Sequence, residues 1–156
     1  MTLPASLHGL TTREAIIDSL YRILRGLDRN EIDLFYSAVT DDIEVQVIGD
    51  ANLSTTGLSS VKAKIFDLVA PMDSSHVISN VRVDVQEGAS NATLQCYCSA
   101  QHCPPGRGQE PDGPKFLGTV DYTLELVLDQ ASGLWKIQKW VLDRLWLQGD
   151  PSVMIP

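Results

Sequence analysis

The chain has few cysteines, and all of them lie on one short stretch. Cys96, Cys98 and Cys103 are the three cysteines of a 156-residue sequence. An odd number of cysteines placed so close together does not make the framework of a disulfide-stabilised secreted domain. A closed zinc site usually needs four converging ligands, often with two residues between paired cysteines, and this spacing does not supply them. We therefore expect neither structural disulfides nor a bound metal ion.

Long apolar runs and clusters of basic residues are missing too. No apolar stretch approaches the ~20 residues that a membrane-spanning helix needs, and the opening MTLPASLHGLTTREA does not resemble a signal peptide. The net charge of −8 would repel nucleic acids and anionic lipid surfaces. The sequence therefore predicts a cytoplasmic protein with no nucleic-acid partner and no membrane partner.

The motifs of nucleotide-binding proteins and of serine hydrolases are also absent: the sequence holds no GxGxxG, Walker or GxSxG pattern. What is present is an ordinary globular composition, with 44% hydrophobic and 21% charged residues. The length fits one domain. We expect a single domain at residues 11–150, flanked by tails at 1–10 and 151–156.

Apolar spacing in the first half predicts three helices. The first begins with a capping box, Thr11 with Glu14, and ends near Gly26. Asp28 and Glu31 repeat the capping pattern before a second helix, whose apolar face is expected to continue to Val39. A short strand at 43–47 and a third helix between residues 57 and 71 follow.

The second half alternates apolar and polar residues, which is typical of strands that are buried on one face. Strands are expected at 76–86, 92–103, 119–128 and 134–147. Helices followed by an antiparallel meander predict an α+β fold, in which three N-terminal helices pack on a strongly curved, mainly antiparallel sheet. Such a cone-shaped α+β barrel leaves a cavity between sheet and helices, and this cavity is a natural site for an apolar small molecule.

His102 is the residue that points most directly to chemistry. It ends the apolar face of its strand, so its imidazole is expected to project into the cavity near the mouth. An unperturbed pKa of ~6.5 suits a general acid or base. A hydrogen bond to the following loop is the structural alternative.

Two further residues, His76 and Asp28, are weaker candidates on their own. His76 shares a face with Asn80, and a β-bulge near residues 80–81 is required if His76 is to point inward. Asp28 has a simple structural explanation as a helix cap. Asn80 and the aromatic residues Tyr36, Tyr122, Trp140 and Trp146 are candidates for contact with a substrate, although each aromatic residue in such a position more often belongs to the core.

Two segments of the sequence resemble a known family. They are LRGLDRNEIDLFYSAVTDDIEVQV and LWKIQKWVLDRLWLQGD; in the second, Trp135, Lys136, Asp143, Trp146 and Asp150 agree with the family. The chain resembles the SnoaL-like members of the nuclear-transport-factor-two-like superfamily, and among named enzymes the scytalone dehydratase family. The resemblance covers about residues 11–150.

The resemblance implies roles for three residues. The dehydratase family has an aspartate where Asp28 stands, and it orients a histidine of the pocket. The family's two histidines lie on the middle strands, where this chain has His76 and His102. Two tyrosines that hold a water on the substrate carbonyl in that family are replaced here by Leu27 and Val47. The resemblance also implies a homodimer, formed through the outer face of the sheet, and an enzyme without cofactor or metal.

The sequence therefore predicts a cofactor-independent cyclase, isomerase or dehydratase that acts on an apolar intermediate of secondary metabolism. Polyketide and meroterpenoid pathways are the context that the resemblance implies. Two alternatives stay open. One is a binding or dimerisation module that returns its ligand unchanged. The other is an epoxide hydrolase of the limonene type, which would need acidic residues that converge in the pocket.

Overall fold

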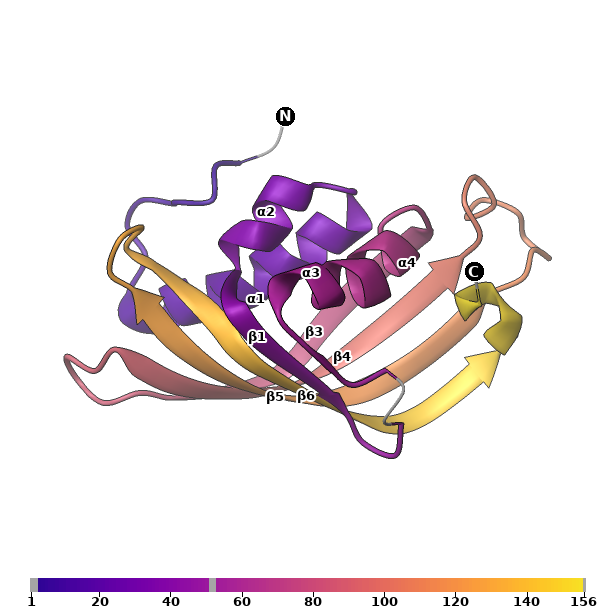
Figure 1. Cartoon of the computed structure of the whole chain (residues 1–156). Helices are drawn as coiled ribbons and strands as arrows, with labels where there is room; N and C mark the ends of the chain where they lie inside the picture. The colour runs from indigo at the N-terminus through magenta and orange to yellow at the C-terminus, as the bar shows by residue number, and fades with distance from the viewer. Residues whose placement is uncertain (1–2, 51–52, 156) are drawn as a thin grey trace.

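The computed structural model of the chain describes residues 3–50 and 53–155. In chain order its elements are α1 (Thr12–Asp28), α2 (Ile32–Ser37), β1 (Val39–Val47), β2 (Thr55–Thr56), α3 (Leu58–Val61), the π-helical turn η1 (Lys62–Phe66), α4 (Asp67–Val69), β3 (Asp73–Asp84), β4 (Asn91–Cys103), β5 (Phe116–Asp129), β6 (Leu134–Gly149) and the 3-10 helix η2 (Pro151–Met154). The helices from α1 to α4 cover one face of a curved sheet (Figure 1).

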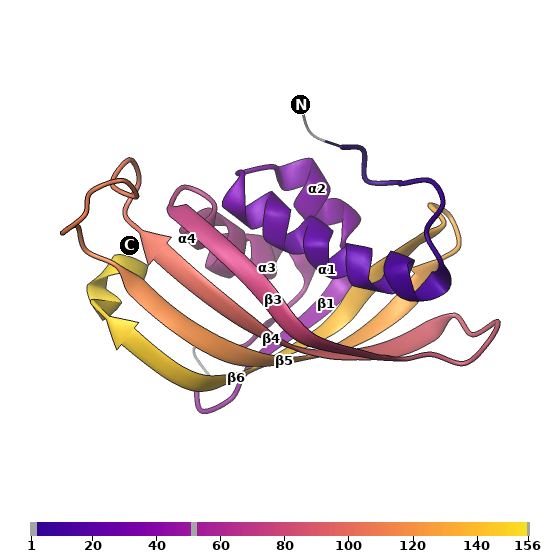
Figure 2. The same ribbon diagram turned by 180° about the vertical axis from the view of Figure 1, so that it is seen from behind.

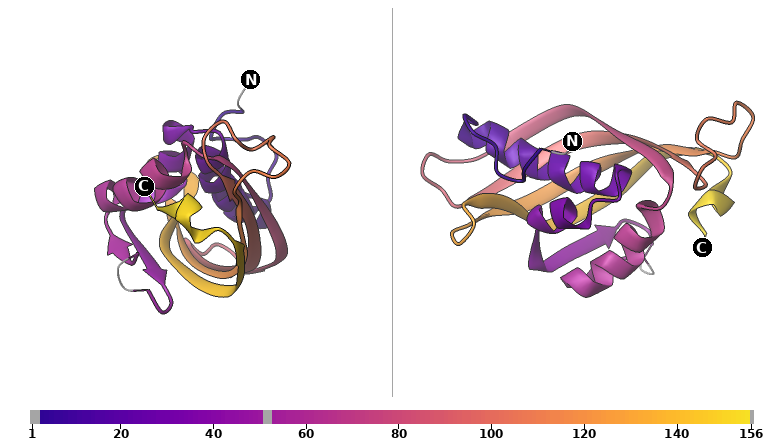
Figure 3. Two further views of the ribbon diagram at one scale, coloured as in Figure 1. Left: turned by 90° about the vertical axis from the view of Figure 1, so that its right-hand side faces the viewer. Right: turned by 90° about the horizontal axis from the view of Figure 1, so that it is seen from above.

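The described strands form one sheet in the order β2-β1-β6-β5-β4-β3. Neighbouring strands are antiparallel except β1 and β6, which run parallel. The predicted fold is thus confirmed, with one refinement: the sheet wraps around the helices without closing into a barrel (Figure 3). The apolar core lies between the concave face of the sheet and the helices.

The first helix begins where the sequence predicts. Thr11 caps it by accepting a hydrogen bond from the backbone N–H of Glu14 at 3.3 Å, and the Glu14 carboxylate accepts from the Thr11 N–H at 2.7 Å. Its apolar face is fully buried against the sheet, where α1 lies along β3 (Figure 2). Gly26 lets α2 approach, because a Cβ there would lie 2.8 Å from the backbone nitrogen of Phe35.

The second helix is shorter than predicted. Its apolar periodicity continues to Val39, but the helix ends at Ser37 and Val39 is the first residue of β1. Pairing with β6 explains the difference, since the Ile137 N–H donates to the carbonyl of Ala38 at 2.8 Å and Val39 faces Ile137 in the parallel register. Tertiary pairing here overrides a helical pattern.

One buried charge ties the helices to the sheet. The Arg22 guanidinium is 4% exposed and donates to the carbonyl oxygens of Ser37 and Trp135, the latter at 2.6 Å. It also pairs with Asp18 at 3.0 Å. Because a buried charge needs its full set of partners, Arg22 fixes α1, the end of α2 and the start of β6 relative to one another.

Irregularities in the long strands produce the curvature of the sheet. The pairing of β3 with β4 shifts register between Ser79 and Arg82, and Asn80 in this bulge has a φ of 54°. The bulge near 80–81 that His76 requires is therefore confirmed. The pairing of β5 with β6 shifts twice more. Each bulge bends its strand and increases the twist.

The C-terminal segment is ordered where a tail was expected. Asp150 caps η2 by accepting a hydrogen bond from the Ser152 N–H at 2.9 Å, and Val153 is buried. The 3-10 helix lies at the same end of the molecule as α4 and the loop between β4 and β5 (Figure 1). None of the described helices has the length and apolar character to cross a membrane.

Candidate active site

The inner face of the sheet near η2 is a grid of side chains from four strands. In one row, β3 to β6 place His76, Ala100, Gly118 and Leu147 side by side. The next row lies closer to the loop between β4 and β5. In it, His102 of β4 pairs with Ser74 of β3 and with Phe116 of β5. On the other side of the His76 row, farther from this loop, the next row consists of Ile78, Cys98, Val120 and Arg144. The registers thus bring both predicted histidines to one end of the concave face.

A cavity of about 390 Å³ lies over this grid. Both histidines line it, and small side chains, Ala100 and Gly118, form the floor beside them. The remaining walls are mostly apolar, and they come from α1, β1, η1, α4, β5, β6 and η2; they include Leu27, Val47, Ile65, Leu68, Val69, Val120, Leu142, Leu147 and Met154. Leu27 and Val47 therefore present hydrocarbon side chains to the cavity.

Asp28 lies behind His76 and binds it twice. One carboxylate oxygen, Oδ1, is 2.6 Å from His76 Nδ1, and the other accepts the backbone N–H of His76 at 2.9 Å. Ser74 donates its hydroxyl to Oδ1 at 3.0 Å. The interpretation of Asp28 as a cap of the second helix is wrong, because it is the last residue of α1 and the N-cap of α2 is Glu31.

This pair fixes the state of the His76 ring. Burial alone would raise the pKa of Asp28, but the hydrogen bonds and charge of His76, with the hydroxyl of Ser74, outweigh burial and lower it. Asp28 is therefore an anion at neutral pH and holds the proton of the ring on Nδ1. Nε2 of His76 is left as the basic nitrogen, and the side chain, 5% exposed, lines the cavity.

His102 lies against His76. The two ring centroids are 5.3 Å apart, with planes at 79°. Burial and the neighbouring His76 lower the pKa of His102 to about 4, so that the ring is neutral at pH 7. Its Nδ1 is buried without a hydrogen-bond partner in the described part of the chain. The ring lines the cavity, where it can form a hydrogen bond with a bound molecule.

Two of the predicted aromatic residues line the cavity. Tyr122 and Trp140 pack edge to face, with ring centroids 5.2 Å apart. Burial, with a contribution from Cys98, raises the pKa of the Tyr122 phenol well above its usual range, so the hydroxyl keeps its proton. The indole nitrogen of Trp140 is buried and has no partner among the described residues.

The other three candidates lie elsewhere. Asn80 is exposed, because the bulge that turns His76 inward leaves it in a left-handed conformation outside the cavity. Tyr36 packs beside Phe35 at the edge of the core, with centroids 6.2 Å apart. Trp146 is 49% exposed, because the bulge in β6 after Arg144 reverses the alternation and turns Leu147 inward instead.

Two basic residues of the cavity wall were not predicted as site residues from the sequence. Arg144 follows Trp140 and Leu142 on the inner face of β6, so the period-two alternation could have placed it. Lys64 belongs to the π-helical turn η1, whose wider winding no pattern in the sequence predicts.

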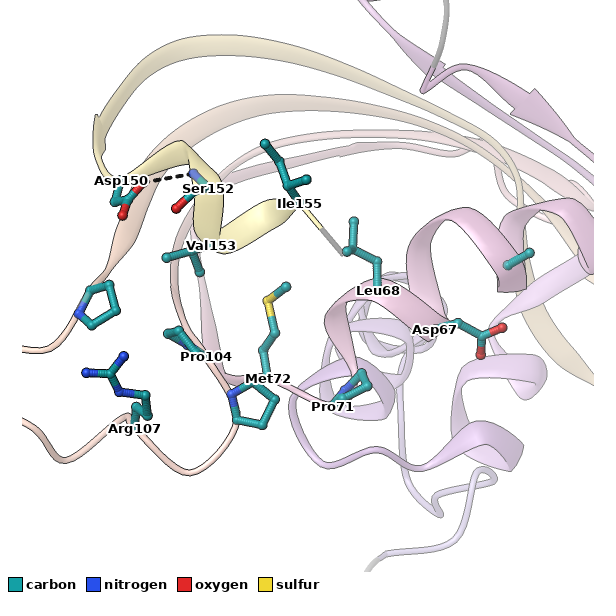
Figure 4. A pocket seen from close by; sticks show the side chains of 13 residues that line it. Asp67, Leu68, Pro71, Met72, Pro104, Arg107, Asp150, Ser152, Val153 and Ile155 are labelled. Carbon is teal, nitrogen blue, oxygen red and sulfur yellow. Dashed lines mark hydrogen bonds between the residues drawn. The ribbon is translucent and has the colours of Figure 1, made fainter.

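A second cavity, of about 630 Å³, lies on the other side of η2 (Figure 4). Its wall includes Ser152, Val153 and Ile155, whereas Pro151 and Met154 of the same segment line the first cavity. Leu68 of α4 belongs to both walls. The C-terminal segment therefore separates the two cavities.

The cysteines take no part in the cavity wall formed by the described residues. Burial raises the pKa of Cys96 to about 12 and that of Cys98 to about 11, so both thiols stay protonated. Cys103, expected on the polar face, is only 1% exposed. The loop after it folds back, and the Gly108 N–H donates to Asp73, the register partner of Cys103, at 2.8 Å.

Residues 9–141 match the model of the SnoaL-like domain, which is most of the chain. The chain belongs to the SnoaL-like domain family. The chain is similar to the terrestric acid biosynthesis cluster protein E of Penicillium crustosum: the two are 36% identical over 152 residues, which cover 97% of this chain and 95% of that protein. The resemblance seen in the sequence is thus confirmed.

Solved structures of this SnoaL-like fold show the same architecture. A putative scytalone dehydratase from Novosphingobium aromaticivorans aligns with a TM-score of 0.73 at 20% identity, over 88% of this chain and 87% of that one. A hexachlorocyclohexane dehydrochlorinase from Novosphingobium barchaimii aligns with a TM-score of 0.68 at 19% identity, over 93% and 94% of the two chains. At these identities the likeness establishes the fold.

Proposed function

We propose that this SnoaL-like protein is a cofactor-independent acid/base enzyme of secondary metabolism, a cyclase, isomerase or dehydratase that acts on an apolar small molecule. The single observation that carries the proposal is the Asp28–His76 pair beside His102 at the end of an apolar cavity. The relation to a biosynthesis cluster protein supports the metabolic setting.

The arrangement supports proton transfer at carbon. Nε2 of His76 removes a proton from a carbon of the substrate, and Asp28 stabilises the imidazolium that forms. His102 is neutral and donates a hydrogen bond to the oxygen where negative charge develops. The imidazolium of His76 then returns the proton. Return to a departing oxygen releases water and completes a dehydration, whereas return to another carbon completes an isomerisation. These transfers need no cofactor.

The rival functions have less support. A binding module without catalysis has no need for a buried carboxylate on the back of a cavity histidine, since that pair carries a desolvation cost. An epoxide hydrolase of the limonene type requires carboxylates that converge on an activated water. The described residues of the cavity wall include Arg144 but no carboxylate.

The test uses the metabolite that accumulates when the gene is deleted in its own host. We expect the purified protein to convert this compound, and His76→Asn to lower kcat about 100-fold or more, because general-base catalysis typically contributes 10²–10⁴-fold. Asp28→Asn should lower kcat as well. Asp33→Asn is the control, because Asp33 is an exposed carboxylate on α2. Conversion by His76→Asn at the rate of the unaltered protein would refute the proposal.

A further inference from the structure

The described part of the cavity wall contains basic side chains and no acidic ones. Of the described wall residues, Lys64 and Arg144 carry full charges at neutral pH, and both are cations. The chain as a whole has twelve basic and twenty acidic side chains. A purely cationic wall in an acidic protein favours an anionic ligand.

The two cations line the cavity from different elements, Arg144 from β6 and Lys64 from η1, and we call this part of the wall the cationic rim. Arg144, on the sheet, pairs with Asp50 at 3.2 Å. Lys64, on η1, donates to the carbonyl of Ser54 at 3.3 Å. Ser54 in turn donates its hydroxyl to the carbonyl of Asp50 at 3.3 Å and accepts the Val47 N–H at 3.1 Å. Arg144 thus contacts Asp50 and Lys64 contacts Ser54, and a hydrogen bond joins these two residues.

This rim lies across the sheet from the histidines. Arg144 is on β6 and His76 is on β3, so three strand spacings, roughly 14 Å along the sheet, separate their backbones. Ala100 and Gly118 lie between, in the row of His76, and leave a shallow apolar floor. The cavity therefore has a proton-transfer end, an apolar middle and a cationic end.

We propose that the ligand of this cavity carries a carboxylate at the end remote from the histidines, and that Arg144 and Lys64 bind it. The inference rests on the proposed function only in taking this cavity as the substrate site. Arg144 and Asp50 are each about one-third exposed, and such a surface pair is weak. A ligand anion enclosed by the cavity wall forms a stronger charge-assisted bond with the same guanidinium.

Two probes of equal shape test the charge preference: naphthalene-2-carboxylate and the neutral naphthalene-2-carboxamide. We measure their dissociation constants by isothermal titration calorimetry at pH 7 on the whole protein. We expect the carboxylate to bind about tenfold more tightly or better, as for a hydrogen bond to a charged group. Equal affinities, or no binding of either probe at millimolar concentration, would overturn the proposal.

Variants then assign the preference to residues. Arg144→Gln and Lys64→Gln should each reduce it, and the double variant should abolish it while the affinity for the amide stays unchanged. Asp50→Asn removes the competing carboxylate and should strengthen carboxylate binding a few-fold. Lys62→Gln is the matched control, since Lys62 lies on the same turn but pairs with Asp67 at 2.6 Å outside the cavity. A preference that survives in the double variant would contradict the assignment.

The binding test and the catalytic test fail independently. His76→Asn should keep the preference for the carboxylate, because the cationic rim is remote from His76. If the preference is found but the accumulated metabolite is not converted, the proposed function fails and the anion site stands. If conversion is found without any preference, the anion site fails and the proposed function stands.

Discussion

His102 shows how the environment of a side chain decides which chemistry it can perform. Its place at the end of the apolar face of β4 was visible in the sequence, and an unperturbed imidazole there would serve as acid or base. Burial against His76 instead holds the pKa of His102 at about 4. His102 is therefore a neutral hydrogen-bonding group, and the base that we propose is His76, which has the Asp28 carboxylate behind it.

The lowered pKa of His102 makes the stability of the protein depend on pH. In the unfolded chain its pKa is near 6.5, so on acidification the unfolded state takes up a proton that the folded state does not. The free energy of unfolding should therefore fall by about 2 kcal/mol from pH 7 to pH 4.5 through this residue. Asp28 contributes little in this window, because its lowered pKa lies below it.

Urea unfolding of the unaltered protein and of His102→Gln at pH 7, 5.5 and 4.5 measures this contribution. The unaltered protein should lose more stability on acidification than the variant does. The difference between the two curves removes the groups that titrate in both proteins. Parallel curves would show that the pKa of His102 is not lowered by the fold.

At the scale of elements, the contact between α1 and α2 controls the position of Asp28. Gly26 is two residues before Asp28, and the backbone of α2 packs directly on it. The end of α1 therefore depends on a place where two helices touch without a side chain between them. A shift of α2 would be transmitted to the carboxylate that orients His76.

We expect Gly26→Ala to destabilise the protein, although alanine favours a helix by about 1 kcal/mol over glycine. The added Cβ would meet the Cβ of Phe35 at 2.9 Å, and overpacking of this kind costs about 1–3 kcal/mol. Urea unfolding measures the change, with the exposed neighbour Arg25→Ala as control. If Gly26→Ala is more stable than the unaltered protein, α2 moves to accommodate the added Cβ without a loss of free energy of unfolding, and the prediction is wrong.

The sequence predicted elements better than it predicted their ends. The capping box at Thr11 and the alternation along β4 were sufficient to place α1 and the buried face with His102, because both signals are local. Val39 was assigned to the wrong element, because its strand conformation comes from pairing with a strand about 100 residues later. Trp146 faces outward for a related reason: one bulge reverses the alternation, and no local signal marks it.

At the scale of the whole molecule, the site is assembled from segments far apart in the chain. Asp28 is the last residue of α1, His76 lies near the start of β3, 48 residues later, and His102 lies near the end of β4. The sequence identified each of the three, and only the resemblance to the dehydratases linked Asp28 to a histidine. Their proximity depends on the curvature of the sheet, which is a property of the assembled fold. The homodimer implied by that resemblance stays a prediction.

The proposed function depends on one step, in which Nε2 of His76 exchanges a proton with a carbon of the substrate. Turnover of the accumulated metabolite in D₂O, followed by mass spectrometry, tests it most directly. Exchange of the imidazolium proton with solvent should introduce deuterium into the isomerised product, or into unreacted substrate if the reaction is a dehydration. The label should be lost in His76→Asn and kept in Asp33→Asn. Equal labelling by His76→Asn and the unaltered protein would contradict the claim.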